Sequence, residues 1–319
     1  MTMSNNIHRK VIILGSGPAG STAAIYTARA NLKPMLIHGL QPGGQMTITH
    51  EVENYPGFAN VVEGPWLMDQ FNKQAENCGT EMVNDTIVEV DLKQKPHVLK
   101  GDSGTTYTCD VLIVATGASA KWLGLESEQK FSGKGVSACA TCDGAFFRGQ
   151  DVVVVGGGNT AMEEALYLSA ICKSVTVVHR RDAFRGEVVL RNRIEKTENI
   201  QVKWNSVVAE IQGTEGPLGG VTSVKLQNTE DGAYEEVPCH GVFIAIGHKP
   251  NTDLFKGQLD MDEYGYLEVE KGTVNTNVDG VFAAGDVADP IYRQAVTAAG
   301  LGCMAALDTI RYVEGLLEA

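Results

Sequence analysis

The chain lacks the features that mark membrane, nucleic-acid-binding and secreted disulfide-rich proteins. None of its apolar runs approaches the roughly 18 residues of a membrane span, and residues 1–10 have no apolar core of a signal peptide. Lysine and arginine total 26 against 39 acidic residues, and the resulting net charge of −13 disfavours binding to nucleic acid or anionic lipid. The seven cysteines are odd in number and scattered, unlike a disulfide framework. We expect a cytoplasmic globular protein with no membrane or nucleic-acid partner.

The sequence has few residue pairs with the spacing of metal ligands, and the clearest is a pair of cysteines. Cys139 and Cys142 lie three positions apart, which lets them reach the Cα separation of a disulfide, about 4.4 to 6.8 Å. A zinc site would need two further ligands, and no second Cys-x-x-Cys or His-x-x-x-His spacing occurs. We therefore favour a pair that can open and close, and we expect no metal site. A zinc half-site or two buried small residues are the alternatives.

Glycine, by contrast, is abundant, and it marks a first dinucleotide-binding pattern near the start of the chain. The apolar strand expected over 10–14 runs into Gly15, Ser16, Gly17, Pro18, Ala19 and Gly20, followed by an alanine-rich helix to Asn31. Glycines permit the tight turn and a close approach of the backbone to a pyrophosphate, which the positive end of the helix attracts. A chance glycine turn is the alternative.

The same pattern returns in the middle of the chain. A valine-rich strand over 151–155 precedes a glycine-rich turn and a helix. The turn spans Gly156 to Ala161 and includes Gly158, Asn159 and Thr160, and alanine takes the third small position of the pattern. The next strand, over 174–178, ends where an NAD-binding unit usually places an acidic residue. Four basic residues stand there instead, namely His179, Arg180, Arg181 and Arg185. Arginine forks bind phosphate oxygens, so this cluster favours a 2′-phosphate; a solvated surface charge run is the alternative.

A third pattern, near the C-terminus, is an apolar strand that is followed by an aspartate. Residues 280–286 end at Gly285 and Asp286, and the carboxylate is well placed to bind a polyol hydroxyl or, alternatively, to cap a helix. The glycine-rich loop 41–45 and the turn 53–57 are either ligand contacts or plain connections. The strand over 34–37 ends at His38 and Gly39 without the expected acidic residue, so the loop alone leaves the first ligand open.

Two apolar strands that end in glycine, 110–117 and 241–247, divide the chain. We expect an α/β protein with two three-layer, Rossmann-like dinucleotide-binding domains, the second inserted into the first. The outer domain would comprise 1–118 and 247–319, and the inserted domain 119–246, which carries the cysteine pair. The length of 319 residues accommodates two such domains.

Six segments together resemble one known family. The segments 51–57, 138–144, 156–161, 179–181, 284–287 and 292–295 are similar, in order and spacing over essentially the whole chain, to low-molecular-weight bacterial thioredoxin reductases. The resemblance implies a homodimeric flavoprotein that reduces thioredoxin with NADPH and so maintains the thiol balance of the cytoplasm. FAD would occupy the outer domain and NADPH the inserted one.

The resemblance also assigns contacts residue by residue. For FAD they are Gly15, Ser16, Gly17, Pro18, Ala19, Gly20, His38, Gly39, Gly43, Gly44, Gln45, Asn54, Gly285, Asp286, Arg293, Gln294 and Ala295. For NADPH they are Gly156, Gly158, Asn159, Thr160, Ala161, His179, Arg180, Arg181 and Arg185.

The resemblance makes Cys139 and Cys142 the redox disulfide. Cys142 would meet the flavin, Cys139 would attack thioredoxin, and Asp143 would act as a general acid, although a turn-forming Asp-Gly explains that position almost as well. The inserted domain would rotate about 116–117 and 247–248 during turnover. The rival hypotheses are a reductase serving a peroxidase-reducing dithiol domain and a non-catalytic redox sensor. The other cysteines are expected to be packed and inert.

Overall fold

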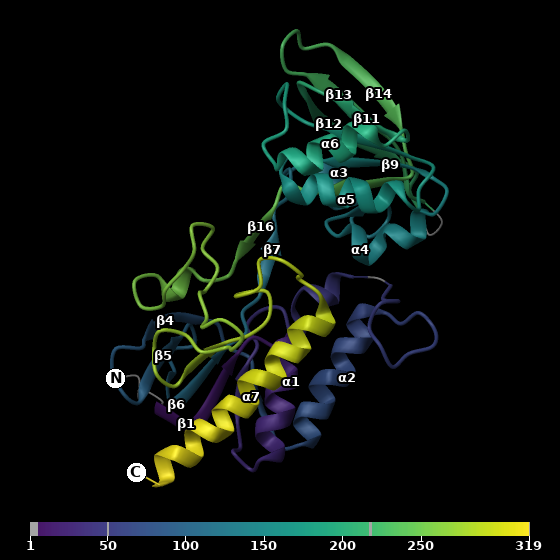
Figure 1. Cartoon of the computed structure of the whole chain (residues 1–319). Helices are drawn as coiled ribbons and strands as arrows, with labels where there is room; N and C mark the ends of the chain where they lie inside the picture. Colours follow the sequence, from purple (N-terminus) through teal and green to yellow (C-terminus); the bar gives the residue numbers. More distant parts are fainter. Residues whose placement is uncertain (1–5, 50, 217–218, 319) are drawn as a thin grey trace. The chain divides into compact units, whose positions relative to one another are not determined.

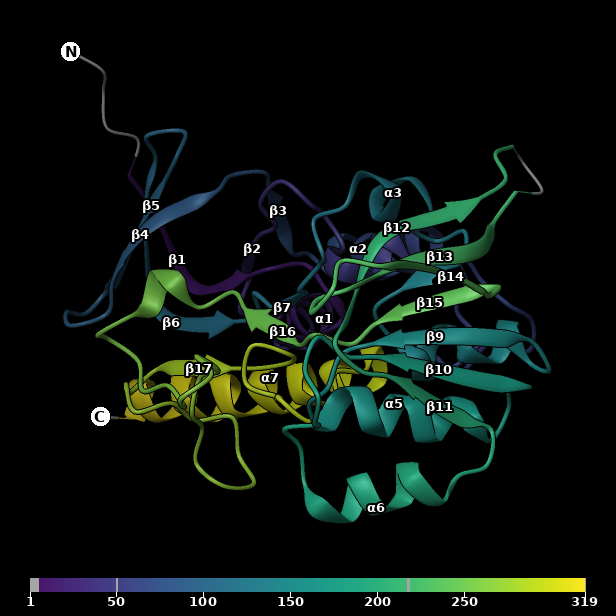
Figure 2. The same ribbon diagram turned by 90° about the horizontal axis from the view of Figure 1, so that it is seen from above.

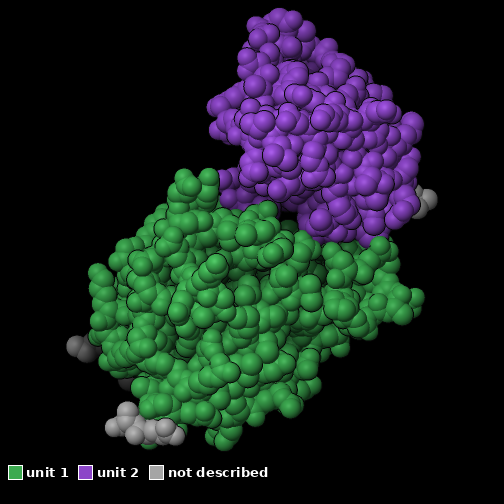
Figure 3. Space-filling model, viewed as in Figure 1, with its two compact units in different colours: residues 1–119, 249–319 green, residues 120–248 purple. Residues whose placement is uncertain are grey.

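The computed structural model describes residues 6–49, 51–216 and 219–318, so residues 1–5 of the N-terminal segment considered above lie outside it. The chain forms two compact units, residues 1–119 with 249–319 and residues 120–248 (Figure 3). The two crossings between the units are β7 (Ala118–Ala120) and β16 (His248–Pro250), and these strands pair with each other. No helix within the described residues is long and apolar enough to span a membrane.

The first unit is built on a seven-stranded sheet. Its strands are β1 (Asn6–Leu14), β2 (Met35–Ile37), β3 (Glu81–Val83), β4 (Ile87–Asp91), β5 (His97–Gly101), β6 (Thr106–Val114) and β17 (Val281–Ala283). The order β3-β2-β1-β6 is parallel, and β6 then pairs with antiparallel β5 along its first half and with parallel β17 along its second. The carboxyl ends of β1, β6 and β17 therefore meet at one edge, which is where ligands bind in such sheets.

Alternating side chains on β1 give this sheet two covered faces. Val11 and Ile13 pack with the helices, whereas Ile12 and Leu14 pack with the β4–β5 side and the segment after β16. The helices are α1 (Pro18–Arg29), α2 (Gly64–Asn77) and α7 (Ala295–Glu318), with short 3-10 turns η1 (Gly44–Ile48) and η3 (Asp253–Phe255). Figure 1 shows α7 beside α1, and a Cβ on Gly302 would lie 2.1 Å from the carbonyl oxygen of Ala19, so glycine permits this close approach.

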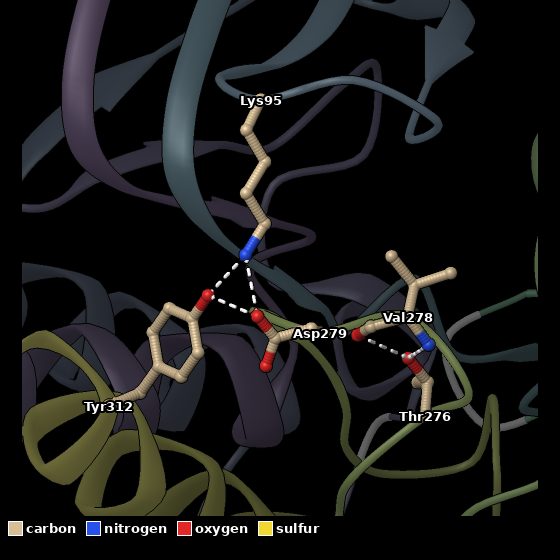
Figure 4. Close-up of polar contacts among 5 residues, drawn as sticks. All are labelled: Lys95, Thr276, Val278, Asp279 and Tyr312. Carbon is tan, nitrogen blue, oxygen red and sulfur yellow. Dashed lines mark hydrogen bonds and ion pairs between the residues drawn. The ribbon is translucent and has the colours of Figure 1, made fainter. Parts of the chain in front are cut away.

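A polar cluster ties α7 to the amino-terminal end of β17. Lys95 Nζ donates to Asp279 Oδ2 over 2.7 Å, the Tyr312 hydroxyl donates to the same oxygen over 2.7 Å, and Lys95 also contacts Tyr312 (Figure 4). Because Lys95 and Asp279 are largely exposed, this ion pair contributes little to stability. The cluster joins three residues that are distant in the sequence.

The second unit is a three-layer sandwich. Its parallel sheet has the order β11-β10-β9-β15-β8, and a separate antiparallel sheet has the order β12-β13-β14. The strands are β8 (Val136–Ser137), β9 (Asp151–Val155), β10 (Ser174–Val178), β11 (Ile200–Lys203), β12 (Ser206–Gly213), β13 (Val221–Asn228), β14 (Tyr234–Pro238) and β15 (Gly241–Ile244). The helices are α3 (Glu126–Lys130), α4 (Ala140–Asp143), α5 (Asn159–Ser169) and α6 (Val188–Lys196), with the 3-10 turn η2 (Gly144–Phe147).

Strand β9 shows why this unit has three layers. Its side chains alternate, so Val152 and Val154 pack with α5 and α6, whereas Val153 and Val155 pack with the antiparallel sheet. Figure 2 shows the parallel strands between these two covers. The predicted α/β class with two Rossmann-like folds is thus confirmed, while the antiparallel sheet β12–β14 was not anticipated.

Candidate functional site

The cysteine pair forms a disulfide at the start of α4. The sulfurs of Cys139 and Cys142 are 2.04 Å apart and their Cα atoms 5.3 Å apart, within the range that a disulfide requires. Both residues are half-buried, and the backbone N–H of Cys139 donates to Ser137 Oγ over 3.0 Å. A disulfide cannot ligate zinc, which excludes the zinc half-site for this form. Among the described residues, no group of three or more His, Cys, Asp or Glu is placed to hold a metal.

Packing on α5 holds the disulfide segment in place. A Cβ on Gly144 would lie 2.8 Å from Leu168 Cδ2 and 3.2 Å from Tyr167 Cε1, so the turn after α4 is pressed against that helix. Asp143 closes α4 and is half-buried. Its role as a general acid stays a prediction.

In the first unit, the glycines after β1 divide into close contacts and an open position. A Cβ on Gly15, whose φ is +101°, would lie 2.2 Å from the Ala115 carbonyl oxygen, and one on Gly20 would lie 1.8 Å from that of Gly15. A Cβ on Gly17 would meet nothing within 4 Å. The outer glycines therefore let strand, turn and α1 pack, while Gly17 leaves open space before the helix N-terminus, as a pyrophosphate site requires.

The loop after β2 lies against this turn. The backbone N–H of Gly43 donates to Ser16 Oγ over 2.8 Å, and a Cβ on Gly44 would lie 3.4 Å from Gly17 Cα. His38 follows β2, whose last residue accepts from the N–H of Gly15 over 2.9 Å. The remaining predicted residues of this loop region, Gly39, Gln45 and Asn54, lie in the turn after β2, in η1 and in the turn 54–57.

Asp286 brings a buried carboxylate to the same edge of the sheet. It follows β17 and Gly285, where a Cβ would lie 2.9 Å from that of Ala19 at the start of α1. Burial, and then the nearby Asp289, raise the pKa of Asp286 to about 6 against a smaller opposing effect of Arg293. Its Oδ1 atom is buried with no hydrogen-bond partner among the described residues. An unsatisfied buried acceptor of this kind fits a polyol hydroxyl.

The segment between Asp286 and α7 is shaped by Asp289. Its carboxylate accepts the backbone N–H groups of Ile291, Tyr292 and Arg293 over 2.9, 2.9 and 3.2 Å, and Arg293 adopts a φ of +50°. Gln294 follows, and Ala295 begins α7. The structure thus brings Gly15 to Gly20, Gly43, Gly44, Gly285 and Asp286 to one edge of one sheet.

The second unit repeats the pattern of close and open glycines. A Cβ on Gly156 would lie 2.4 Å from the Ala245 carbonyl oxygen and 2.7 Å from the Cβ of Ala161, whereas one on Gly158 would meet nothing within 4 Å. Thr160 and Ala161 form the first turn of α5 with Asn159. This is again a turn with open space at a helix N-terminus.

The basic cluster after β10 separates into one interior residue and three exposed ones. Arg180, Arg181 and Arg185 are exposed, but His179 is buried and its ring stacks on Phe184 with centroids 5.9 Å apart. Burial, with the three arginines adding to it, lowers the pKa of His179. His179 is therefore neutral at pH 7, and the arginines supply the charge for an anion.

Two hydrogen bonds hold this cluster to the glycine turn. The N–H of Arg185 donates to the Gly157 carbonyl oxygen over 2.9 Å, and the N–H of Glu187 donates to Asn159 Oδ1 over 2.8 Å. Sequence reasoning missed Glu187 and Phe184 as supporting residues, because a turn side chain and a single aromatic residue have no periodic signal. Ser16 was expected as an FAD contact, and its hydroxyl also accepts the backbone N–H of Gly43.

Comparison with known proteins agrees with this geometry. Residues 9–302 match the family model described as pyridine nucleotide-disulphide oxidoreductase. A thioredoxin reductase of Rickettsia conorii is 58% identical, with 96% of this chain and 99% of that protein covered. A Pseudomonas fluorescens protein named glucosaminate ammonia-lyase is 56% identical, with 98% of each covered. The structure of a Giardia duodenalis thioredoxin reductase superposes with a TM-score of 0.91 at 42% identity, covering 97% of this chain and 99% of that one.

Proposed function

This chain belongs to the pyridine nucleotide-disulphide oxidoreductase family and, within it, to the thioredoxin reductases, and we propose that it carries two electrons from NADPH through FAD to the Cys139–Cys142 disulfide and on to a thioredoxin. The resemblance that the sequence indicated is confirmed, and the chain is a flavoprotein disulfide oxidoreductase that uses a nicotinamide cofactor. The observation that carries the proposal is a disulfide in a chain with two separate dinucleotide-binding turns.

FAD is the flavin that suits the first unit, and we assign it to residues 1–118 and 247–319. The open position at Gly17 and the N-terminus of α1 suit a pyrophosphate, and the unpartnered Oδ1 of Asp286 suits a ribitol hydroxyl. A flavin supplies the chemistry that joins a hydride donor to a disulfide, since it accepts an electron pair from a nicotinamide and passes it to sulfur.

NADPH is the nicotinamide that suits the second unit, and we assign it to residues 119–246. Gly158 leaves room for the pyrophosphate at the N-terminus of α5. The exposed guanidinium groups of Arg180, Arg181 and Arg185 suit the 2′-phosphate, which NADH lacks.

The two cysteines then reduce the protein substrate by thiol–disulfide exchange. Two electrons and two protons convert the Cys139–Cys142 disulfide to a dithiol. The thiolate of Cys139 attacks one sulfur of the thioredoxin disulfide, and the other thioredoxin sulfur leaves as a thiolate that Asp143 protonates. Cys142 then loses its proton and its thiolate attacks Cys139 Sγ in the mixed disulfide. The second thioredoxin sulfur leaves as a thiolate and takes up that proton, which releases dithiol thioredoxin and restores the Cys139–Cys142 disulfide.

We further propose a homodimer located in the cytoplasm. The free cysteines among the described residues, namely Cys78, Cys109, Cys172, Cys239 and Cys303, suit a reducing compartment.

The test follows NADPH oxidation by the purified flavoprotein with and without oxidised thioredoxin. Turnover that requires thioredoxin supports the proposal, and Cys142→Ser keeps flavin reduction by NADPH but abolishes thioredoxin reduction. Ammonia release from glucosaminate is the control, because one relative bears that name. Bleaching of the flavin by NADPH without reoxidation by thioredoxin would overturn the proposed substrate.

A further inference from the structure

A threonine between the two cysteines contacts one of their sulfurs. Thr141 Oγ1 lies 3.4 Å from Cys139 Sγ, within hydrogen-bond distance for sulfur. A disulfide sulfur carries no hydrogen, so the hydroxyl is the donor and the sulfur the acceptor. Thr141 is exposed, whereas Cys139 is half-buried.

The contact reaches the sulfur of Cys139, which the disulfide joins to the sulfur of Cys142. Both cysteines are half-buried, so their burial class does not separate them, whereas the hydroxyl contact is made to Cys139. A donor that strengthens its bond when sulfur becomes negative favours the thiolate at that sulfur and lowers its pKa.

We propose that the Thr141 hydroxyl stabilises the Cys139 thiolate once the disulfide opens, and so makes Cys139 the cysteine that attacks the protein substrate. The inference rests on the proposed function, because it names a further catalytic residue for that exchange. Reduction breaks the S–S bond with two electrons, the hydroxyl then donates to the Cys139 thiolate, and the proton stays on Thr141 Oγ1. When the thiolate forms a bond to the substrate sulfur, its negative charge passes to the leaving sulfur.

The size of the effect follows from two opposing trends. Loss of the donor should raise the pKa of Cys139 by about one unit, which lowers the thiolate fraction about tenfold at a pH below that pKa. Each remaining thiolate is about threefold more nucleophilic, since reactivity rises with thiol pKa. The net loss in the rate of attack is about threefold.

The experiment compares Thr141→Val, which removes the hydroxyl at nearly constant shape, with Thr141→Ser, which restores it. The holoenzyme is reduced with dithiothreitol, freed of reagent without oxygen, and treated with iodoacetamide over a range of pH. Mass spectrometry of the peptide gives the labelling rates of Cys139 and Cys142 separately, so each sample contains its own reference.

We expect Thr141→Val to move the pH midpoint of Cys139 labelling upward by about one unit, with the Cys142 midpoint unchanged and Thr141→Ser like the wild type. The kcat/KM for thioredoxin should fall about threefold while the KM for NADPH stays constant. An unmoved Cys139 midpoint, an equal shift at both cysteines, or no rescue by serine would overturn the inference. Failure of the wild type to reduce thioredoxin would instead contradict the proposed function, while the labelling midpoints would still report on Thr141.

Discussion

The imidazole of His179 lies against the backbone of Gly157, so closely that a Cβ on Gly157 would stand 2.2 Å from both its Cε1 and Nδ1 atoms. The ring is enclosed on its other sides by Phe184 and by Trp204, whose ring centroid is 6.1 Å away. The His179 ring thus packs against the glycine turn. Arg180 and Arg181 directly follow His179 in the sequence, so the same segment that packs on the turn also carries the arginines.

Substitution of Gly157 should therefore be harmful to the fold, and substitution of Gly158 should not. Gly157→Ala forces the enclosed ring to move and should lower the free energy of unfolding by about 1–3 kcal/mol in urea titrations. Gly158→Ala meets no atom within 4 Å, so stability should change by less than about 0.5 kcal/mol while the KM for NADPH rises.

The cause is checked by a double variant. Removing the ring with His179→Ala relieves the clash, so Gly157→Ala should cost less in that background than in the wild type. If the losses in the free energy of unfolding from the two substitutions simply add in the double variant, the His179 ring is not what a Cβ on Gly157 meets.

The exposed arginines should determine the choice of nicotinamide. Arg181→Gln removes a charge-assisted contact to the 2′-phosphate and should raise the KM for NADPH by at least about tenfold, with little change in kcat or in the KM for NADH. Steady-state kinetics with both nucleotides measures this. Lys173→Gln is the matched control, because this substitution removes one positive charge from the same unit. Lys173 lies outside the arginine cluster and pairs with Asp151 over 2.9 Å. An equal loss with NADH would contradict a role in reading the phosphate.

The buried carboxylate of Asp286 should make the apoprotein less stable as the pH rises. Its pKa is raised from 3.8 to about 6, so ionisation opposes folding: the penalty is absent below about pH 4, grows between pH 4 and 6, and is complete above pH 6. Asp286→Asn has no proton to lose. Its stability relative to the wild type should therefore increase by up to about 3 kcal/mol between pH 4 and pH 7.5.

Urea unfolding of both apoproteins at several pH values gives this difference directly. Parallel pH profiles would show that Asp286 does not titrate as the structure implies. The same substitution should weaken FAD binding about tenfold at pH 7.5, because an amide oxygen is a weaker acceptor than a carboxylate. Fluorescence titration with FAD measures that loss.

The interior thiols should resist alkylation in the folded, oxidised protein. Burial raises the pKa of Cys172 to about 11 and that of Cys239 to about 12, and it raises the pKa of Cys109 further still. At pH 8 these three should react with iodoacetamide at least about tenfold more slowly than half-buried Cys78, as peptide mass spectrometry can measure. Comparable labelling of Cys109 and Cys78 would contradict this burial. Denaturation is the control, since it should make all of them react.

Local patterns predicted much of the fold and of the site. The strand over 10–14 and the glycines after it specify a turn without reference to distant residues, and the structure has that turn between β1 and α1. The same holds for β9 and α5. The spacing of Cys139 and Cys142 suffices for a disulfide, because both partners lie on one short segment.

Contacts between distant segments could not be predicted in this way. The cover of β12–β14 over the second sheet was missed, because short alternating strands look alike whether they join the main sheet or pack on it. His179 reads as a cation beside three arginines, but its burial against Gly157 and Phe184 makes it neutral. The contact between Gly43 and Ser16 joins two loops with no shared pattern.

By itself, the amino-acid sequence determined the two dinucleotide turns, the cysteine pair, the α/β class and the family, because each depends on residue type and short spacing. The tertiary structure alone decided which glycines are packed and which are open, the neutral state of His179, the raised pKa of Asp286 and the hydroxyl beside Cys139. Burial and the distances between side chains set these properties, and both arise when segments far apart in the chain pack together.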